Sequence, residues 1–231
     1  MSRSDYGQSC AVVLSLILVV LNLSVTGCAA RGSAPTAEPP KVSNLQTLLV
    51  APFKIASERY EVGTTVRCAI CGAVFIAGPA NPGDDAYMTN QLLTYLKANT
   101  NYALIPPGAG EGVRSKLLAE SLDLAERNLL LEMGRQLGAD AVVSGTIFRF
   151  RQRVGTSYAS DTPASVAFSM YLLRVADGNV IWDGYFDETQ KPLHEDLLQL
   201  STFIKRGGAF VTAEQLAHAG LNKVMTDFPV P

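Results

Sequence analysis

Two strand-like segments joined by a short turn signal restrict the fold of this chain more than any other feature. The segments Val166 to Val175 and Val180 to Phe186 are apolar and aromatic, and Asp177 followed by Gly178 separates them. Asp-Gly between two such runs predicts a β-hairpin with a two-residue type I′ turn, whose positive φ angles glycine adopts without strain. The two-residue period of a strand then places four residues on one buried face: Val180, Trp182, Gly184 and Phe186.

The segments around this hairpin alternate between strand-like and helical patterns. Strands are expected at 47–53, 102–105 and 141–154, and helices at 84–99, within 111–137, at 193–205 and at 212–227. Strands separated by helices pair in parallel, whereas the hairpin adds antiparallel strands. The sequence therefore predicts an α/β fold. We expect a single mixed β-sheet of about five strands with helices packed against it, forming one domain over residues 47–231.

An apolar run near the start of the chain indicates export. Ala11 to Leu21 is too short to span a bilayer, which takes about 20 apolar residues, but it fits the core of a signal peptide. The following residues, Val25, Thr26, Gly27 and Cys28, resemble a bacterial lipobox. That resemblance implies a signal peptide over residues 1–27, cleavage before Cys28, and a diacylglycerol on the Cys28 sulfur.

The residues after Cys28 have the composition of a tether. Arg31 to Lys41 is rich in Pro and Ala and has no apolar periodicity, so we assign 28–46 to the lipidated cysteine and its linker. Ala29 stands where an inner-membrane retention signal would often place Asp, by resemblance to enterobacterial sorting. The expected location is the outer membrane, with the domain facing the periplasm and the N-terminal lipid as the membrane contact.

Composition excludes several classes of protein. The chain is 48% hydrophobic and 17% charged, so it has enough apolar residues to form a core and is not disordered throughout. Its 19 basic and 21 acidic residues leave no basic excess to neutralise phosphates, so no nucleic-acid partner is expected.

The most distinctive motif is a cysteine pair, Cys68 and Cys71, followed by Gly72 in a long segment over 54–83. Haem attachment would need His at position 72. A thioredoxin-like site would need a helix after the first Cys, and the following residues are strand-like. A zinc knuckle would need two further ligands, for which only His194 and His218 remain. We favour a Cys68–Cys71 disulfide in an oxidising periplasm, with redox and metal-binding roles as the alternatives.

Charged residues alternate along two strands. Arg149, Arg151 and Arg153 share one face of the strand over 141–154, and Asp183 and Asp187 share a face of the last strand. Such stripes are typical of solvated strand faces, which we favour over an anion site or a pair of catalytic carboxylates. No set of residues has the spacing of a catalytic site, so the chain is expected to be no enzyme and to need no cofactor.

Four segments together resemble the curli-pore (CsgG) and TolB amino-terminal group of periplasmic lipoprotein domains. They are the strand Leu48 to Phe53, the helix Asp84 to Asn99, the helix-to-strand junction Leu137 to Thr146, and the hairpin Val175 to Trp182. That group includes small lipoproteins that activate peptidoglycan synthases or support polysaccharide export. The resemblance implies a shared fold and compartment rather than one activity.

These observations predict a non-catalytic, lipid-anchored scaffold or adaptor that binds other envelope proteins and that could form homo-oligomers. One alternative is a thiol, disulfide or metal-binding protein that uses Cys68 and Cys71. A second alternative, suggested by the resemblance, is a subunit of a curli-type secretion channel. A channel would need paired membrane segments of about ten alternating residues, which the sequence lacks.

Overall fold

The computed structural model describes residues 45–121, 124–155, 160–190 and 211–231, which all belong to the compact unit Pro39–Pro231. The signal peptide, Cys28, most of the tether and the helix expected over 193–205 lie outside the described residues. Among the described residues, no helix is long and apolar enough to cross a membrane.

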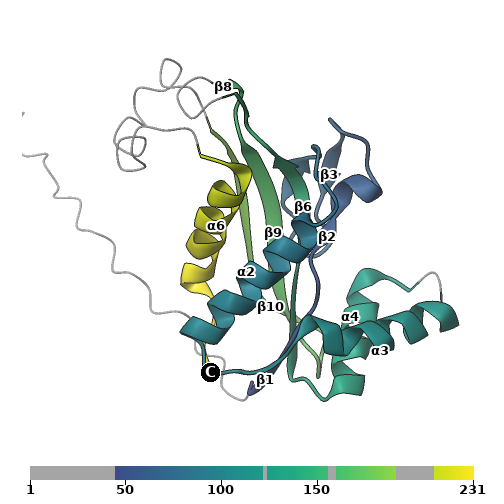
Figure 1. Ribbon diagram of the computed structural model, residues 1–231. Coiled ribbons are helices and arrows are strands. Elements are labelled where there is room, and N and C mark those ends of the chain that lie inside the picture. Colours follow the sequence, from purple (N-terminus) through teal and green to yellow (C-terminus); the bar gives the residue numbers. More distant parts are fainter. Residues whose placement is uncertain (1–44, 122–123, 156–159, 191–210) are drawn as a thin grey trace, which may run out of the picture. The chain divides into compact units, whose positions relative to one another are not determined.

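The centre of the fold is a mixed sheet with the strand order β10-β9-β6-β1-β5, and β2 pairs with β6 beyond the end of β1 (Figure 1). β1 runs parallel to both β5 and β6, whereas the β6–β9 and β9–β10 pairs are antiparallel. This arrangement confirms the predicted mixed sheet. The strands are β1 (Thr47–Val50), β2 (Lys54–Ile55), β5 (Ala103–Ile105), β6 (Ala141–Arg151), β9 (Ser165–Arg174) and β10 (Val180–Thr189).

In the described part of the chain, four α-helices accompany the sheet: α2 (Asp84–Asn99), α3 (Pro107–Glu120), α4 (Glu126–Leu137) and α6 (Ala213–Val224). Short 3₁₀ turns follow β2 and α6, η1 at Ala56–Glu58 and η3 at Met225–Asp227. A capping box begins α6, because the Thr212 hydroxyl accepts from the backbone N–H of Gln215, and the Gln215 side-chain oxygen accepts from the backbone N–H of Thr212. Gly138 ends α4 at a φ of 68°, as expected for a C-terminal glycine.

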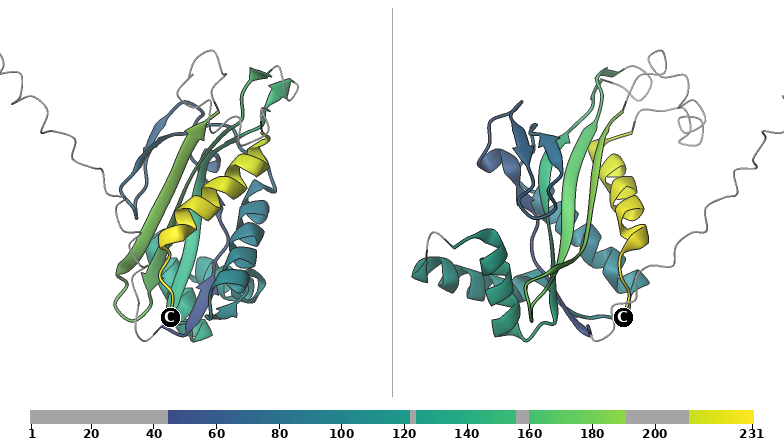
Figure 2. Two further views of the ribbon diagram at one scale, coloured as in Figure 1. Left: turned by 90° about the vertical axis from the view of Figure 1, so that its left-hand side faces the viewer. Right: turned by 180° about the vertical axis from the view of Figure 1, so that it is seen from behind.

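Two layers cover the sheet, one on each face (Figure 2). Helices α2 and α6 cover one face, where Met88, Leu92, Leu216 and Leu221 pack against the sheet. Helix α4 covers part of the other face, and a small hairpin covers a further part of it.

Strand β9 is therefore buried on both sides. Val166, Phe168, Met170 and Leu172 face α2 and α6, and Ala167, Tyr171 and Leu173 face the other layer.

The small hairpin forms within 54–83, a long segment for which no strand pair was predicted. Its strands are β3 (Thr65–Arg67) and β4 (Val74–Ile76), and they pair antiparallel. Phe75 stacks on Phe148 of β6 with ring centroids 4.0 Å apart, which fixes the hairpin to the sheet. Another two-stranded ribbon, β7 (Val154–Gly155) with β8 (Ser160–Thr162), extends the end of β6.

The β9–β10 hairpin confirms the two antiparallel strands but corrects their turn and their register. Arg174 donates its backbone N–H to the carbonyl oxygen of Asn179 at 2.9 Å, so four residues lie between them instead of two. Gly178 has the positive φ, 74°. A bulge between Val180 and Trp182 then shifts the alternation. As a result Val180 packs on the α4 side, whereas Trp182 packs on the α6 side.

Trp182 is half-buried, so its removal should cost less than the loss of a fully buried aromatic. It meets the ring of Phe228 edge-on, with centroids 4.9 Å apart. We expect Trp182→Ala to lower the free energy of unfolding by about 2 kcal/mol, below the roughly 3–5 kcal/mol of a fully buried aromatic. Denaturant unfolding checks this, with Tyr185→Ala, which is 60% exposed, as the smaller control. An effect no larger than the control would mean that the Phe228 contact is not formed.

The prediction of a solvated basic stripe along β6 is wrong for Arg149. Its side chain is only 12% exposed and forms an ion pair with Asp187 of β10. It also donates to the hydroxyl of Ser165 at 2.6 Å and to the carbonyl oxygen of Ile76 at 2.9 Å. Arg149 therefore joins the small hairpin to β9 and β10 of the sheet.

Candidate functional site: a dithiol pocket and the adjoining cleft

The two cysteines lie in the turn of the β3–β4 hairpin. Cys68 donates its backbone N–H to Ala73 at 2.8 Å, and Gly72 donates to the carbonyl oxygen of Cys68 at 3.0 Å. Gly72 has a φ of 72°, a conformation that favours glycine. This tight turn points the backbone N–H of Cys71 at the sulfur of Cys68, 3.1 Å away. The Cys-X-X-Cys-Gly pattern therefore closes the hairpin and also places a donor on one sulfur.

The structure brings both predicted cysteines together as free thiols. The disulfide between Cys68 and Cys71 stays a prediction. The zinc alternative gains no further ligand here, since the described residues contain no group of three or more His, Cys, Asp or Glu side chains able to hold a metal. His218 lies exposed on α6, which covers the opposite face of the sheet, and His194 lies outside the described residues.

Hydroxyl groups from the sheet lie beneath the cysteines. Ser144 of β6 is paired with Tyr171 of β9, and Thr146 is paired with Ser169, so all four side chains share the face that the hairpin covers. The Ser169 hydroxyl lies 3.6 Å from the sulfur of Cys68. Burial raises the pKa of Tyr171 to about 12, so its hydroxyl keeps its proton. The cysteine sulfurs thus face a layer of neutral hydrogen-bonding groups.

The two thiols differ strongly in acidity. A hydrogen bond from the Cys71 side chain, aided by backbone N–H groups and by Ser169, lowers the pKa of Cys68 to about 5 against the opposing effect of burial. The same hydrogen bond raises the pKa of Cys71 far above its usual value, and burial adds to this. The shifts in opposite directions favour the thiolate on Cys68 and the proton on Cys71.

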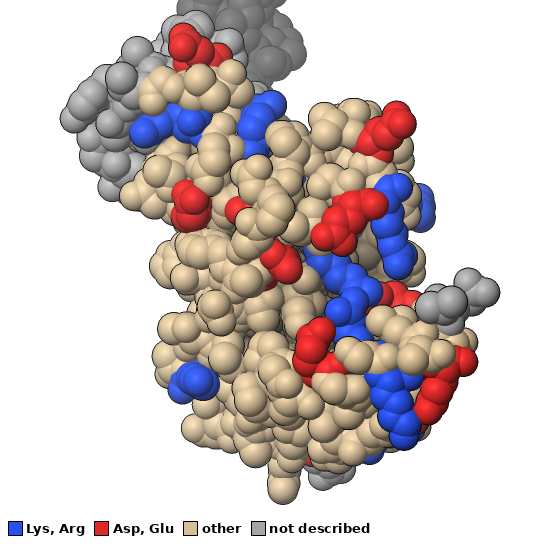
Figure 3. Space-filling model, turned by 45° about the vertical axis from the view of Figure 1, so that its right-hand side comes forward, with Lys and Arg blue, Asp and Glu red and all other residues tan. Residues whose placement is uncertain are grey.

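A cavity of about 240 Å³ opens beside Cys68, and we call it the dithiol pocket. It lies between the hairpin, η1, the sheet and the α3–α4 pair, and Cys68, Thr146 and Tyr171 contribute to its wall. Figure 3 shows a band of basic side chains on this side of the molecule, with acidic side chains beside it. The charged residues of the pocket are four basic and two acidic ones: Lys54, Arg59, Arg67, Arg114, Glu58 and Glu126.

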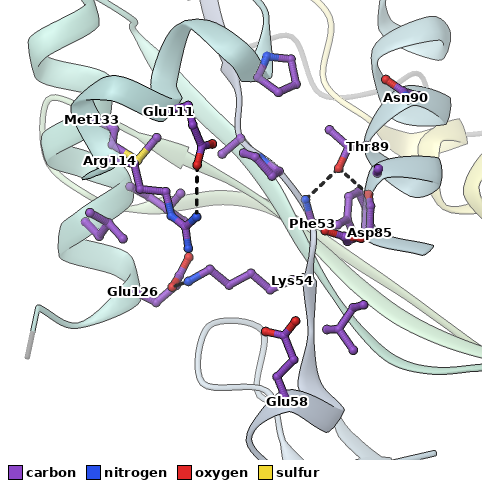
Figure 4. A pocket seen from close by; sticks show the side chains of 17 residues that line it. Phe53, Lys54, Glu58, Asp85, Thr89, Asn90, Glu111, Arg114, Glu126 and Met133 are labelled. Carbon is purple, nitrogen blue, oxygen red and sulfur yellow. Dashed lines mark hydrogen bonds and ion pairs between the residues drawn. The ribbon is translucent and has the colours of Figure 1, made fainter. Parts of the chain in front are cut away.

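A second cavity of about 430 Å³, the strand-end cleft, adjoins the dithiol pocket and shares Lys54, Glu58, Arg114 and Glu126 with it (Figure 4). The cleft begins at the carboxyl end of β1, between α2 on one side and α3 and α4 on the other. Strands β5 and β6 lie on either side of β1. The connection to β5 through α2 and the connection to β6 through α3 and α4 therefore run in opposite directions at this point. Open α/β sheets bind ligands at such switch points.

Ion pairs arrange the charges in the cleft. Lys54 forms an ion pair with Glu126, and Arg114 lies 3.9 Å from Glu111. Burial, together with Arg114 and Arg59, lowers the pKa of Lys54 to about 8. The second carboxylate oxygen of Glu126 is buried and has no hydrogen-bond partner among the described residues. The cleft therefore offers both donors and an acceptor to a polar ligand.

Sequence reasoning identified the cysteines but not the charged residues around them. Lys54, Arg59, Arg67, Arg114 and Glu126 come from five separate elements or turns, and no spacing in the sequence connects them. Only the sheet topology brings α3 and α4 to the side of β1 that faces the hairpin. The lipobox cysteine, Cys28, lies outside the described residues.

The sequence matches no family model and no curated protein. The fold is similar to that of solved bacterial proteins at low identity. The PelC dodecamer from Paraburkholderia phytofirmans is 14% identical, with 84% of this chain and 95% of that chain covered, at a TM-score of 0.47. Lipoprotein GNA1162 from Neisseria meningitidis is 15% identical, with 71% of this chain and 98% of that chain covered, at a TM-score of 0.40.

The LpoB C-terminal domain from Escherichia coli is 19% identical, with 65% of this chain and 87% of that chain covered, at a TM-score of 0.40. At these identities and TM-scores, the likenesses assign no activity, partner or assembly to this chain. None of these structures is a CsgG or TolB protein, so that narrower resemblance stays a prediction.

Proposed function

We propose that this protein is a lipid-anchored adaptor of the bacterial cell envelope, which binds other envelope proteins in a role that needs no catalysis. The lipobox carries the proposal, since Val25 to Cys28 follow an apolar run too short to span a bilayer. Ala29 after the cysteine favours the outer membrane, with the domain facing the periplasm.

The linker sets the distance at which such an adaptor acts. Residues 29–46 separate the lipidated cysteine from β1. A flexible linker of this length spans roughly 25 Å on average, and a fully extended proline-rich one roughly 55 Å. The domain would therefore meet partners that lie on the membrane or within a few tens of ångströms of it.

Replacing Cys28 with Ala tests the anchor. We expect the wild-type chain to incorporate labelled fatty acid and to sediment with membranes, and Cys28→Ala to lose the label, because acylation needs the thiol. Cys10→Ala is the matched control, because Cys10 precedes the apolar run and should keep both properties. Fatty acid retained in Cys28→Ala would overturn the lipid anchor.

Cross-linking in intact envelopes tests the adaptor role. We expect discrete adducts between the wild-type chain and envelope proteins, and these should decrease in Cys28→Ala because the domain lacks its lipid anchor. Adducts of the chain with itself would indicate a homo-oligomer. Ring-shaped particles in detergent would favour the curli-type channel instead, and an exclusively monomeric chain without adducts would contradict the adaptor.

A further inference from the structure

We propose that Cys68 and Cys71 form a thiol–disulfide exchange site for small anionic disulfides, in which Cys68 attacks and Cys71 resolves. This activity is independent of the adaptor role. It rests on the turn that holds the two cysteines, on the cavity beside Cys68, and on the charges that line this cavity.

The positions of the two sulfurs assign their roles. Cys68 lines the dithiol pocket, and its sulfur accepts the backbone N–H of Cys71. Cys71 packs beside the apolar cluster of Phe75 and Phe148, within hydrogen-bonding distance of Cys68. Donors that stabilise a thiolate make it available as the nucleophile, and a thiol held next to it can attack a mixed disulfide. In this protein a hairpin turn supplies the donor that a helix N-terminus supplies in thioredoxin-like sites.

Burial of Cys68 and the shape of the pocket restrict the substrate to a small molecule. Cys68 is only 6% exposed, so a disulfide on the surface of a folded protein cannot easily reach its sulfur. The dithiol pocket, at about 240 Å³, is at the lower end of small-molecule sites, and the adjoining strand-end cleft provides further room.

The charges of the pocket select an anionic substrate. Four basic side chains face two acidic ones around Cys68. A partly enclosed cavity with an excess of one sign concentrates ligands of the opposite sign. Arg59, Arg67 and Arg114 can also bind carboxylates through paired N–H donors. A disulfide that carries carboxylates, such as a peptide disulfide of the glutathione type, fits both features.

The exchange proceeds in two balanced steps. The Cys68 thiolate attacks one sulfur of the substrate, whose S–S bond breaks, and the departing thiolate takes a proton from solvent. Cys71 then loses its proton and attacks the sulfur of Cys68, which forms the Cys68–Cys71 disulfide and releases the second thiolate to be protonated. One small disulfide is reduced to two thiols, and the cysteine pair is oxidised by two electrons.

A trapping experiment tests the roles of the two cysteines. The full chain is purified in detergent with Cys10→Ala and Cys28→Ala, so that only Cys68 and Cys71 remain, and is then reduced and mixed with glutathione disulfide. We expect this chain to release two glutathiones and form an internal disulfide. Adding Cys71→Ser should trap one glutathione on Cys68 by mass spectrometry, while Cys68→Ser should react at least tenfold more slowly. Trapping on Cys71, or a pair that resists reduction, would overturn the proposal.

The pH dependence of trapping separates an activated thiolate from an ordinary thiol. In Cys71→Ser the serine hydroxyl can still donate to the sulfur, so the low pKa of Cys68 should be largely kept. Its rate with glutathione disulfide should therefore change less than threefold between pH 6 and 8, whereas an ordinary thiol gains about 75-fold over that range. A rate that rises like that of an ordinary thiol would contradict the proposal.

Charge variants test the substrate class. The rate constant of the Cys71→Ser chain with each disulfide is divided by the rate constant of a free thiol with the same disulfide. We expect this ratio to be higher for glutathione disulfide than for the cationic disulfide cystamine. Arg67→Ala with Arg114→Ala should reduce this preference about tenfold. Arg174→Ala, on the distant β9–β10 turn, should leave it unchanged. Equal rates for the two probes would overturn the anionic substrate, and a tightly bound soft metal ion that blocks the reaction would assign the pair to metal binding instead.

Discussion

Phe168→Ala should lower the free energy of unfolding by about 4 kcal/mol, within the range for fully buried aromatic residues. Phe168 is 0% exposed at the centre of β9. Its ring meets Phe53 edge-on at 6.4 Å and Phe186 at 5.6 Å, so the alanine leaves a cavity between β1, β10 and the covering helices. A loss of this size is a large part of the roughly 5–15 kcal/mol that stabilises a domain.

Urea unfolding measures this effect, and Phe168→Leu is the matched control. Leucine fills most of the volume, so its cost should stay near 1–1.5 kcal/mol. If alanine and leucine cost the same, the ring does not occupy the centre of the core, and the face assigned to α2 and α6 would be wrong.

Gly145→Ala should be destabilising by about 3 kcal/mol, although it adds a single methyl group. A Cβ at Gly145 would clash with the buried ring of Phe53 and would lie 2.7 Å from the backbone oxygen of Ser169 on β9. Strands β6 and β9 cannot move apart to accept the methyl group, because they are paired with each other along the strand on both sides of Gly145. Overpacked cores lose about 1–3 kcal/mol, and contact with backbone leaves the least room for relaxation.

Gly112→Ala provides the opposite expectation for the same chemical change. Gly112 lies inside α3, and a Cβ there meets nothing within 4 Å. Because alanine is the better helix former, this substitution should be stabilising by up to about 1 kcal/mol. Two alanine variants with equal stability would show that Phe53 does not pack over Gly145.

The strands and helices with long, regular patterns could be predicted from the sequence. The two strands of the β9–β10 hairpin appear where expected. The capping box at Thr212 and Gln215 and the glycine at the end of α4 are likewise local signals that the sequence carries. The residues after Cys71 were expected to be strand-like, but their pairing in the β3–β4 hairpin was missed because strands of three residues are too short to show a period. The bulge after Val180 was missed because it depends on how β10 pairs with β9.

The sequence by itself determined the longer strands and helices of the described residues and their order, the mixed sheet, and the presence of a cysteine pair with a turn glycine. These follow from interactions between residues close together in the chain, which the local pattern encodes. Only the tertiary structure decided that Cys68 faces a basic pocket, that Arg149 is buried beside Asp187, and that Trp182 and Val180 lie on opposite faces. Those outcomes depend on which segments the sheet brings side by side, and that arrangement is set by packing across the whole fold.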